Sequence, residues 1–202
     1  MAPVFEKETE GIYRLRIPFD TLYTSVFLVE SERGPILVDC ATTGDDVERY
    51  ILPALSDRGY RATDLFALVL SHKHGDHAGG LPRLKELAPN LTVITDPCTL
   101  TKHLSVYPLG GHTEDAIGLL DTRTGTLITA DGIQGGGVDK YRTSVQNANA
   151  YLATLKRIED DSRVQSLLFS HAYEPWLCDS LWGKEAVCAC LTDCKKYVGD
   201  KK

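Results

Sequence analysis

Short apolar runs separated by polar residues occupy the first forty residues, a pattern that predicts extended structure rather than helix. Three runs have the length of short strands, and residues 31–34 between the second and third run have the composition of a hairpin turn. The fold is therefore expected to open with an antiparallel meander. The three predicted strands cover residues 12–17, 25–30 and 35–39.

A helix is predicted after residue 45, where apolar side chains recur at helical spacing behind Asp45 and Asp46. Pro53 inside this stretch predicts that the helix kinks or ends early. Residues 66–70 form a continuous apolar run, which is typical of a strand buried on both faces. The later predicted elements are helices at about residues 80–87, 144–159 and 184–198, strands at 91–95, 105–107 and 164–169, and a hairpin at 116–129 that turns at 122–125.

Strands and helices thus alternate along the chain, which indicates a fold of the α/β class. Two sheets whose outer faces are covered by helices would produce this order, and so would a single doubly wound sheet. The chain has 202 residues, of which 43% are hydrophobic and 25% are charged. We therefore expect one soluble domain over residues 1–202.

The net charge of -6 comes without a basic run, which disfavours nucleic acid as a partner and favours a small-molecule substrate. No apolar stretch reaches the ~18 residues of a membrane span, and residues 1–7 do not resemble a secretory leader. We therefore expect a cytoplasmic protein without a membrane partner. The sequence leaves the oligomeric state open.

Four of the six cysteines, Cys178, Cys188, Cys190 and Cys194, lie near the end of the chain and suggest either a metal site or core packing. No pair has the C-x₂-C spacing of structural zinc. On a helix over residues 184–198, Cys190 and Cys194 fall on one apolar face while Cys188 lies outside it, which favours core packing. We expect reduced thiols, because a chain of this size does not need a disulfide framework.

Directly after the apolar run, four strong metal ligands occur within six residues: His72, His74, Asp76 and His77. Alternate histidines on an extended segment project to the same side, while Asp76 and His77 enter a turn and face a neighbouring point. One loop could therefore serve two adjacent metal ions. Imidazole and carboxylate ligands favour divalent zinc, with iron and manganese as alternatives.

These four residues form an H-x-H-x-D-H motif, and in this the chain resembles the metallo-β-lactamase superfamily. Three later segments follow in the family's order: a G-H-T motif at His112, an aspartate after a strand at Asp131, and a last histidine at His171. Asp39 resembles the family's site-supporting aspartate. The resemblance covers about residues 10–175 and implies an αβ/βα sandwich of two mixed sheets covered by helices, with the metal site at one edge.

The resemblance also implies a ligand assignment and a chemistry. One divalent metal ion would be held by His72, His74 and His112, a second by Asp76, His77 and His171, and Asp131 would bridge them. A hydroxide between the metals would be the nucleophile, which makes Asp76 and Asp131 the expected catalytic residues. Because metal would occupy Asp76, protonation of an amine leaving group would be difficult, so ester, lactone or thioester cleavage is favoured. His103 is expected either at the surface or next to the metal ligands without binding metal itself.

The sequence differs from individual branches of the family at readable positions, and these differences limit the range of expected activities. Lactonases of the family carry a tyrosine three residues beyond the bridging aspartate, where this chain has Gln134, although Tyr141 could supply the phenol. Glyoxalase II adds a helical glutathione-binding domain after the last histidine, and one class of zinc β-lactamases has a cysteine at the position of Asp131. A mononuclear iron persulfide dioxygenase is the non-hydrolytic alternative, and a regulatory protein with a retained metal site is a third.

Aromatic and polar residues near the predicted ligands are candidates for the walls of a substrate pocket, because aromatic side chains often form apolar pocket surface. Ordinary core or surface packing is the competing interpretation. The candidates are Tyr23 in an early loop, Gln134, Tyr141, Tyr173 and Trp176, with Trp182 and residues 135–137 as further possibilities.

Overall fold

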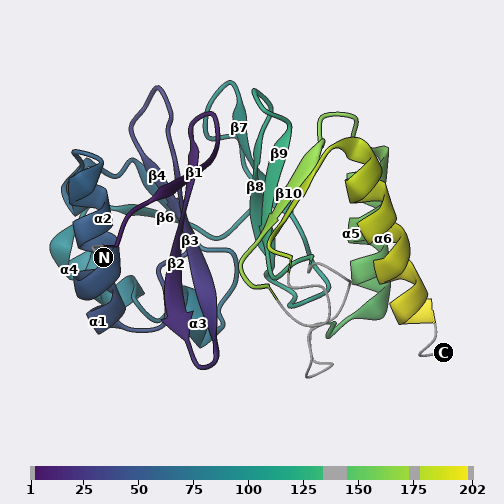
Figure 1. Cartoon of the computed structure of the whole chain (residues 1–202), viewed down its shortest axis with the longest axis horizontal. Helices are drawn as coiled ribbons and strands as arrows, with labels where there is room; N and C mark the ends of the chain where they lie inside the picture. Colours follow the sequence, from purple (N-terminus) through teal and green to yellow (C-terminus); the bar gives the residue numbers. More distant parts are fainter. Residues whose placement is uncertain (1–2, 134–144, 173–177, 200–202) are drawn as a thin grey trace. The chain divides into compact units, whose positions relative to one another are not determined.

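A computed structural model of the chain describes residues 3–133, 145–172 and 178–199 (Figure 1). It contains two compact units, Met1–Thr95 and Asp96–Lys202. Each unit has its own mixed β-sheet, its own helices and its own hydrophobic core. The predicted α/β class with two sheets is therefore confirmed, and the alternative of a single doubly wound sheet is wrong.

The first sheet has six strands in the order β1-β2-β3-β4-β5-β6. Strands β1 to β4 pair antiparallel, which confirms the predicted opening meander, and β5 and β6 then add in parallel. The sequence pattern does not predict β1, because its four residues are all exposed or half-buried and lack alternation. The strands are β1 (Glu6–Thr9), β2 (Ile12–Phe19), β3 (Leu22–Val29), β4 (Ile36–Val38), β5 (Ala67–Val69) and β6 (Thr92–Ile94).

The helix predicted after residue 45 continues through Pro53 instead of ending there. It consists of α1 (Gly44–Asp46), a π-helical turn η1 (Val47–Ile51) and α2 (Leu52–Asp57). Proline has no N–H and its ring clashes with a carbonyl of the preceding turn in a regular helix. Because the N–H of Leu52 bonds to the carbonyl of Val47, the turn before Pro53 is wider and accommodates the ring. The prediction of an early end is therefore wrong.

Helices pack on one face of the first sheet. Alternate residues of β2, namely Tyr13, Leu15 and Ile17, lie in the same core as Val47 and Ile51 of η1. The alternation that predicts β2 is thus the pattern of one buried face. The remaining helices of this unit are η2 (Ala62–Asp64), α3 (Gly75–Ala78) and α4 (Leu81–Leu87).

The second sheet has five strands in the order β11-β10-β9-β8-β7. The predicted hairpin is confirmed as β8 and β9, which pair antiparallel, whereas β10 pairs parallel with β9. β11 is a short edge strand that the sequence pattern does not predict. The elements are β7 (Leu104–Pro108), β8 (Ile117–Asp121), β9 (Thr126–Ala130), α5 (Ala148–Asp160), β10 (Ser166–Phe169), β11 (Ser180–Trp182) and α6 (Lys184–Gly199).

Helices α5 and α6 lie side by side against the second sheet (Figure 1). The predicted stripe of α6 is confirmed, because Cys190 and Cys194 are buried in the core together with Val187, Leu191 and Val198. Cys190 and Cys194 bring their Sγ atoms within 4.0 Å. All six cysteines are described and none forms a disulfide.

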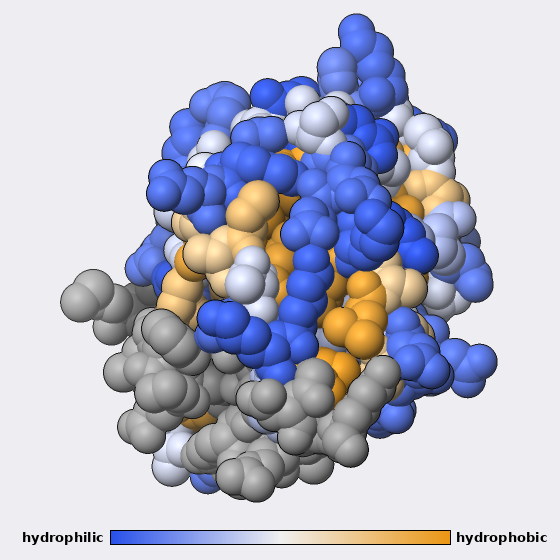
Figure 2. Space-filling model, turned by 90° about the vertical axis from the view of Figure 1, so that its right-hand side faces the viewer, coloured by the Kyte–Doolittle hydropathy of each residue, from blue (hydrophilic) through white to orange (hydrophobic). Residues whose placement is uncertain are grey.

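Hydrophilic residues cover most of the described surface on this side of the molecule (Figure 2).

Among the described residues, no helix combines the length and the apolar character that crossing a membrane requires.

Candidate metal centre

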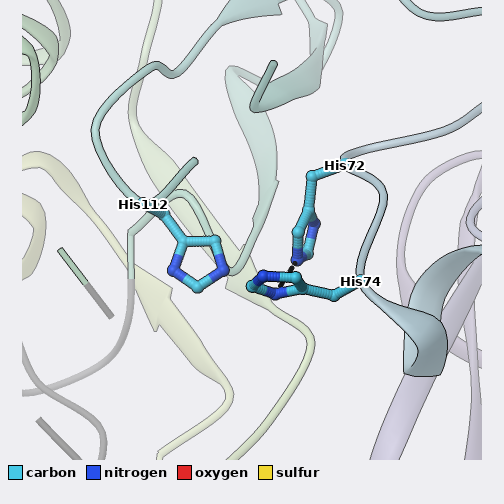
Figure 3. A group of neighbouring side chains, drawn as sticks. All are labelled: His72, His74 and His112. Carbon is cyan, nitrogen blue, oxygen red and sulfur yellow. Dashed lines mark hydrogen bonds between the residues drawn. The ribbon is translucent and has the colours of Figure 1, made fainter. Parts of the chain in front are cut away.

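The first group of predicted ligands lies in residues 72–77, the ligand loop, which comprises the segment after β5 and the start of α3. His72 and His77 are buried, and His77 lies within the short helix α3. The rings of His72 and His74 meet edge to face, with centroids 4.5 Å apart, and Nε2 of His72 lies 2.9 Å from Nδ1 of His74 (Figure 3). Asp76 Oδ2 lies 3.3 Å from His77 Nε2. The loop therefore presents two neighbouring pairs of ligand atoms, as the spacing predicts.

Asp39, at the end of β4, is the residue that fixes this loop. Its carboxylate is completely buried and accepts hydrogen bonds from the N–H and the hydroxyl of Ser71, both at 2.8 Å. Its Oδ2 also lies 2.7 Å from Nδ1 of His77. The backbone of Asp39 has a φ of +65°, in the left-handed region that aspartate tolerates better than most residues. This local conformation places one carboxylate behind two segments of the ligand loop.

Two residues that the sequence did not single out hold the backbone of the loop. The N–H of Cys40 donates to the carbonyl of His77 at 2.9 Å, and the Cys40 thiol lies 3.2 Å from the same oxygen. Burial, with the neighbouring Asp39 charge, raises the pKa of the Cys40 thiol far above its usual range, so it stays protonated. Thr24 donates its hydroxyl to the carbonyl of Asp76 at 3.2 Å. These contacts link β3 and β4 to the ligand loop.

The second group of predicted ligands lies in the second unit, where each residue follows a strand. His112 comes after β7, Asp131 directly follows β9, and His171 comes after β10. All three are buried. Asp131 lies between the histidines, with Oδ2 3.9 Å from His112 Nε2 and Oδ1 3.4 Å from His171 Nε2. The carboxylate therefore has one oxygen near each imidazole.

The loop that carries His112 is held by α5. Thr154 of α5 donates its hydroxyl to the carbonyl of Gly110 at 2.7 Å, and the N–H groups of Gln146 and Asn147 donate to the carbonyl of Gly111. The chain can follow this path because Gly111 has a φ of +137°, which residues with a Cβ rarely adopt. The His112 ring is labelled in Figure 3. Sequence reasoning had no short-range signal for Thr154.

The remaining predicted residues lie in varied surroundings. Tyr23 lies within β3 rather than in an early loop, half-buried, with the Arg16 guanidinium 5.6 Å from its ring centroid. The expectation of a loop there is wrong, because β3 begins three residues earlier than the predicted strand. Trp182 belongs to the edge strand β11 and is exposed, and His103 is half-buried. Gln134, Tyr141, Tyr173, Trp176 and residues 135–137 lie outside the described residues.

The donor sets fit divalent metal ions. Each unit contributes imidazole nitrogens and carboxylate oxygens, and the ligand atoms of His72 and His74, of Asp76 and His77, and of Asp131 and His171 lie within 4.8 Å of one another in each case. Such donors suit zinc, iron and manganese. Asp39 lies against Nδ1 of His77, so that Nε2 is the nitrogen on the side of Asp76, an arrangement common for metal-binding histidines. Fold and donors together define an α/β protein with histidine and aspartate clusters compatible with divalent metal binding.

Part of the chain matches a known protein family. Residues 19–97, which include the ligand loop at 72–77, match the metallo-beta-lactamase superfamily. The likeness to this superfamily in sequence is shown for these residues, and the likeness in fold extends further. Its fold is similar to that of a metallo-beta-lactamase from Pseudomonas aeruginosa solved in a mono-zinc form, with a TM-score of 0.75 at 17% identity over 98% of this chain and 97% of that one.

Two curated relatives with named activities match over part of their length. An atrochrysone carboxyl ACP thioesterase from Pseudocercospora fijiensis is 26% identical over 155 residues, which cover 69% of this chain and 44% of that protein. An N-acyl homoserine lactonase from Bacillus thuringiensis is 36% identical over 75 residues, which cover 27% of this chain and 30% of that protein. The chain thus spans less than half the length of either relative.

Proposed function

We propose that this protein is a binuclear metal-dependent hydrolase that cleaves an ester, lactone or thioester bond of a small molecule, with zinc as the favoured metal. The observation that carries the proposal is the position of Asp131, whose two carboxylate oxygens lie 3.9 and 3.4 Å from the Nε2 atoms of His112 and His171. A carboxylate that offers one oxygen to each of two histidine-bound ions is suited to bridge them.

The proposed ligand assignment follows the chemistry of the two loops. The first ion would take His72, His74 and His112, the second would take Asp76, His77 and His171, and both would share Asp131. Two divalent ions held by these residues would supply an activated water and would polarise the substrate carbonyl. The match of residues 19–97 to the metallo-beta-lactamase superfamily and the nitrogen and oxygen donors support this assignment.

The residues of the chain favour substrates with good leaving groups. Asp76 and Asp131 are both assigned to metal, so neither carboxylate is left to protonate an amine as it departs. A thiolate or a ring-opened alkoxide needs less help from a general acid than an amine does. The names of the distant relatives, a thioesterase and a lactonase, agree with this preference.

The test is metal analysis combined with a substrate panel. The protein would be purified without chelator, reconstituted with excess zinc, iron or manganese, and assayed against lactones, thioesters, simple esters and β-lactams. We expect about two metals per chain and hydrolysis of a lactone, ester or thioester that chelation abolishes and metal restores. A content of one metal or less after reconstitution would contradict the binuclear site. Oxygen uptake with the iron form and no hydrolysis would contradict the hydrolase.

A further inference from the structure

Ser71 makes a pair of contacts that the proposed ligand set does not use. Its hydroxyl lies 2.8 Å from Oδ2 of Asp39 and 3.0 Å from Nδ1 of His72, and all three side chains are buried. The hydroxyl therefore stands between a carboxylate and an imidazole. Sequence reasoning identified both neighbours but gave Ser71 no role.

The chemistry of these groups determines which way the protons point. The Ser71 hydroxyl donates its single proton to Asp39. The hydroxyl oxygen can then only accept from His72, which requires the proton on Nδ1. The lone pair of His72 is consequently on Nε2, the nitrogen that faces Nδ1 of His74 at 2.9 Å.

The same carboxylate determines the tautomer of a second histidine. Asp39 Oδ2 lies 2.7 Å from Nδ1 of His77, so His77 donates from Nδ1 and keeps its lone pair on Nε2. Asp39 reaches His77 directly, whereas it reaches His72 only through Ser71. The proposed assignment places these two histidines on different metal ions.

On this basis we propose that Ser71 is a positioning residue for the first metal ion. Its hydroxyl connects the Asp39 carboxylate to Nδ1 of His72 through two hydrogen bonds, here called the relay, and thereby fixes Nε2 as the ligand atom of His72. This inference rests on the proposed binuclear site. Asp39 then acts on both ions, and Ser71 acts on one. The backbone of Asp39 is in the left-handed region, with a φ of +65°. Such strain persists only where the surrounding structure holds it and is common at functional sites, which supports a functional role for Asp39.

Three substitutions separate this role from ordinary packing. Ser71→Ala removes the relay, and Ser71→Thr keeps a hydroxyl at the same place. Ser25→Ala is the matched control, because Ser25 is a buried serine of the same unit whose hydroxyl accepts a hydrogen bond from Arg14 at 3.4 Å. Each full-length variant would be titrated with zinc against a chromophoric chelator, and its urea midpoint would be recorded beside the titration.

We expect Ser71→Ala to weaken one of the two zinc-binding steps by about 10–100-fold and to leave the other near wild type. Ser71→Thr and Ser25→Ala should bind both ions like the wild type. If Ser71→Ala binds both ions as tightly as the wild type, the proposal is wrong. If the wild type itself binds fewer than two ions, the binuclear function fails instead, so the two failures are distinguishable.

A spectroscopic measurement on the wild-type protein tests the proposal independently, and the Ser71 variants extend it. In ¹⁵N-labelled, zinc-loaded wild-type protein, His72 should carry its proton on Nδ1 and bind zinc through Nε2. The proton should exchange with water faster in Ser71→Ala than in Ser71→Thr. A wild-type spectrum with His72 bound through Nδ1 would overturn the relay even if Ser71→Ala failed to fold.

Discussion

Gly111 lies directly against the backbone of Tyr151, so closely that a Cβ on Gly111 would be 2.5 Å from the Cα of Tyr151. Through this contact the loop that carries His112 packs closely against helix α5. It depends on the absence of a side chain, and Gly111 also has a φ of +137° that disfavours any other residue.

Gly111→Ala is therefore expected to reduce the free energy of unfolding by about 3 kcal/mol, because overpacking and backbone strain act together. The control is Gly59→Ala, where φ is +79° but nothing lies within 4 Å of the added Cβ. That variant should lose only about 1 kcal/mol through its backbone. Urea unfolding of both variants measures the difference, and equal losses would show that the Tyr151 contact is unimportant.

His112→Ala and His171→Ala should each lower turnover while the protein stays folded, because the two histidines are assigned to different ions. Loss of a residue that hydrogen-bonds to a metal ligand typically lowers metal affinity or activity by about 10–100-fold, so loss of a ligand itself should lower turnover by about 100-fold or more. Turnover, metal content and circular dichroism would be measured together. Near-wild-type turnover in either folded variant would remove that histidine from the ligand set.

Asp131→Ala should be the most damaging single ligand change, because its carboxylate has one oxygen near His112 and the other near His171. Loss of a bridge disturbs both ions and their separation, whereas loss of His112 directly affects one. Turnover and metal content of Asp131→Ala and His112→Ala would be compared at full metal loading on the best substrate. If Asp131→Ala holds two ions and is the faster of the pair, Asp131 is not the bridge.

Lys184→Met should destabilise the second unit. The Lys184 ammonium lies 3.2–3.4 Å from four carbonyl oxygens at and beyond the end of α5, those of Ile158, Glu159, Asp161 and Val164. Hydrogen bonds from a charged donor to partly buried acceptors are worth about 1.5–3 kcal/mol, and the methionine leaves these acceptors without that donor.

Lys156→Met is the control for Lys184→Met, because it removes an exposed pair with Asp160 that contributes little to stability in the presence of solvent screening. Thermal or urea unfolding would compare the two variants. Equal stability losses would contradict the role assigned to Lys184.

Asp161→Asn should change stability in a pH-dependent way. Hydrogen bonding to Arg163 lowers the pKa of Asp161 below its ordinary value of 3.8. A carboxyl whose pKa is lowered by folding stabilises the protein above the unfolded pKa, and this contribution disappears as the pH falls through the folded pKa. The exposed Arg163 limits the effect to about 1 kcal/mol at pH 7.

The difference in unfolding free energy between wild type and Asp161→Asn should therefore shrink as the pH falls below about 4. Urea unfolding between pH 7 and pH 2.5 checks this. A difference that stays constant over that range would show that the ion pair is not its source.

The sequence by itself was sufficient for features that depend on neighbours along the chain. The stripe on α6, the hairpin of β8 and β9 and the apolar strand before His72 follow from side-chain periodicity, which local backbone geometry imposes. The H-x-H-x-D-H spacing likewise predicted the paired ligand atoms of the loop. Such patterns need no knowledge of distant contacts.

Only the tertiary structure decided what depends on residues far apart in sequence. The division into two sheets, and the parallel pairing of β9 with β10, require knowledge of which strands meet in space. The same holds for Asp39 and Ser71, which lie 32 positions apart and yet share hydrogen bonds behind the ligand loop. Periodicity records which face of an element is buried, but hydrogen bonds and strand partners arise from packing between elements, and no local pattern encodes them.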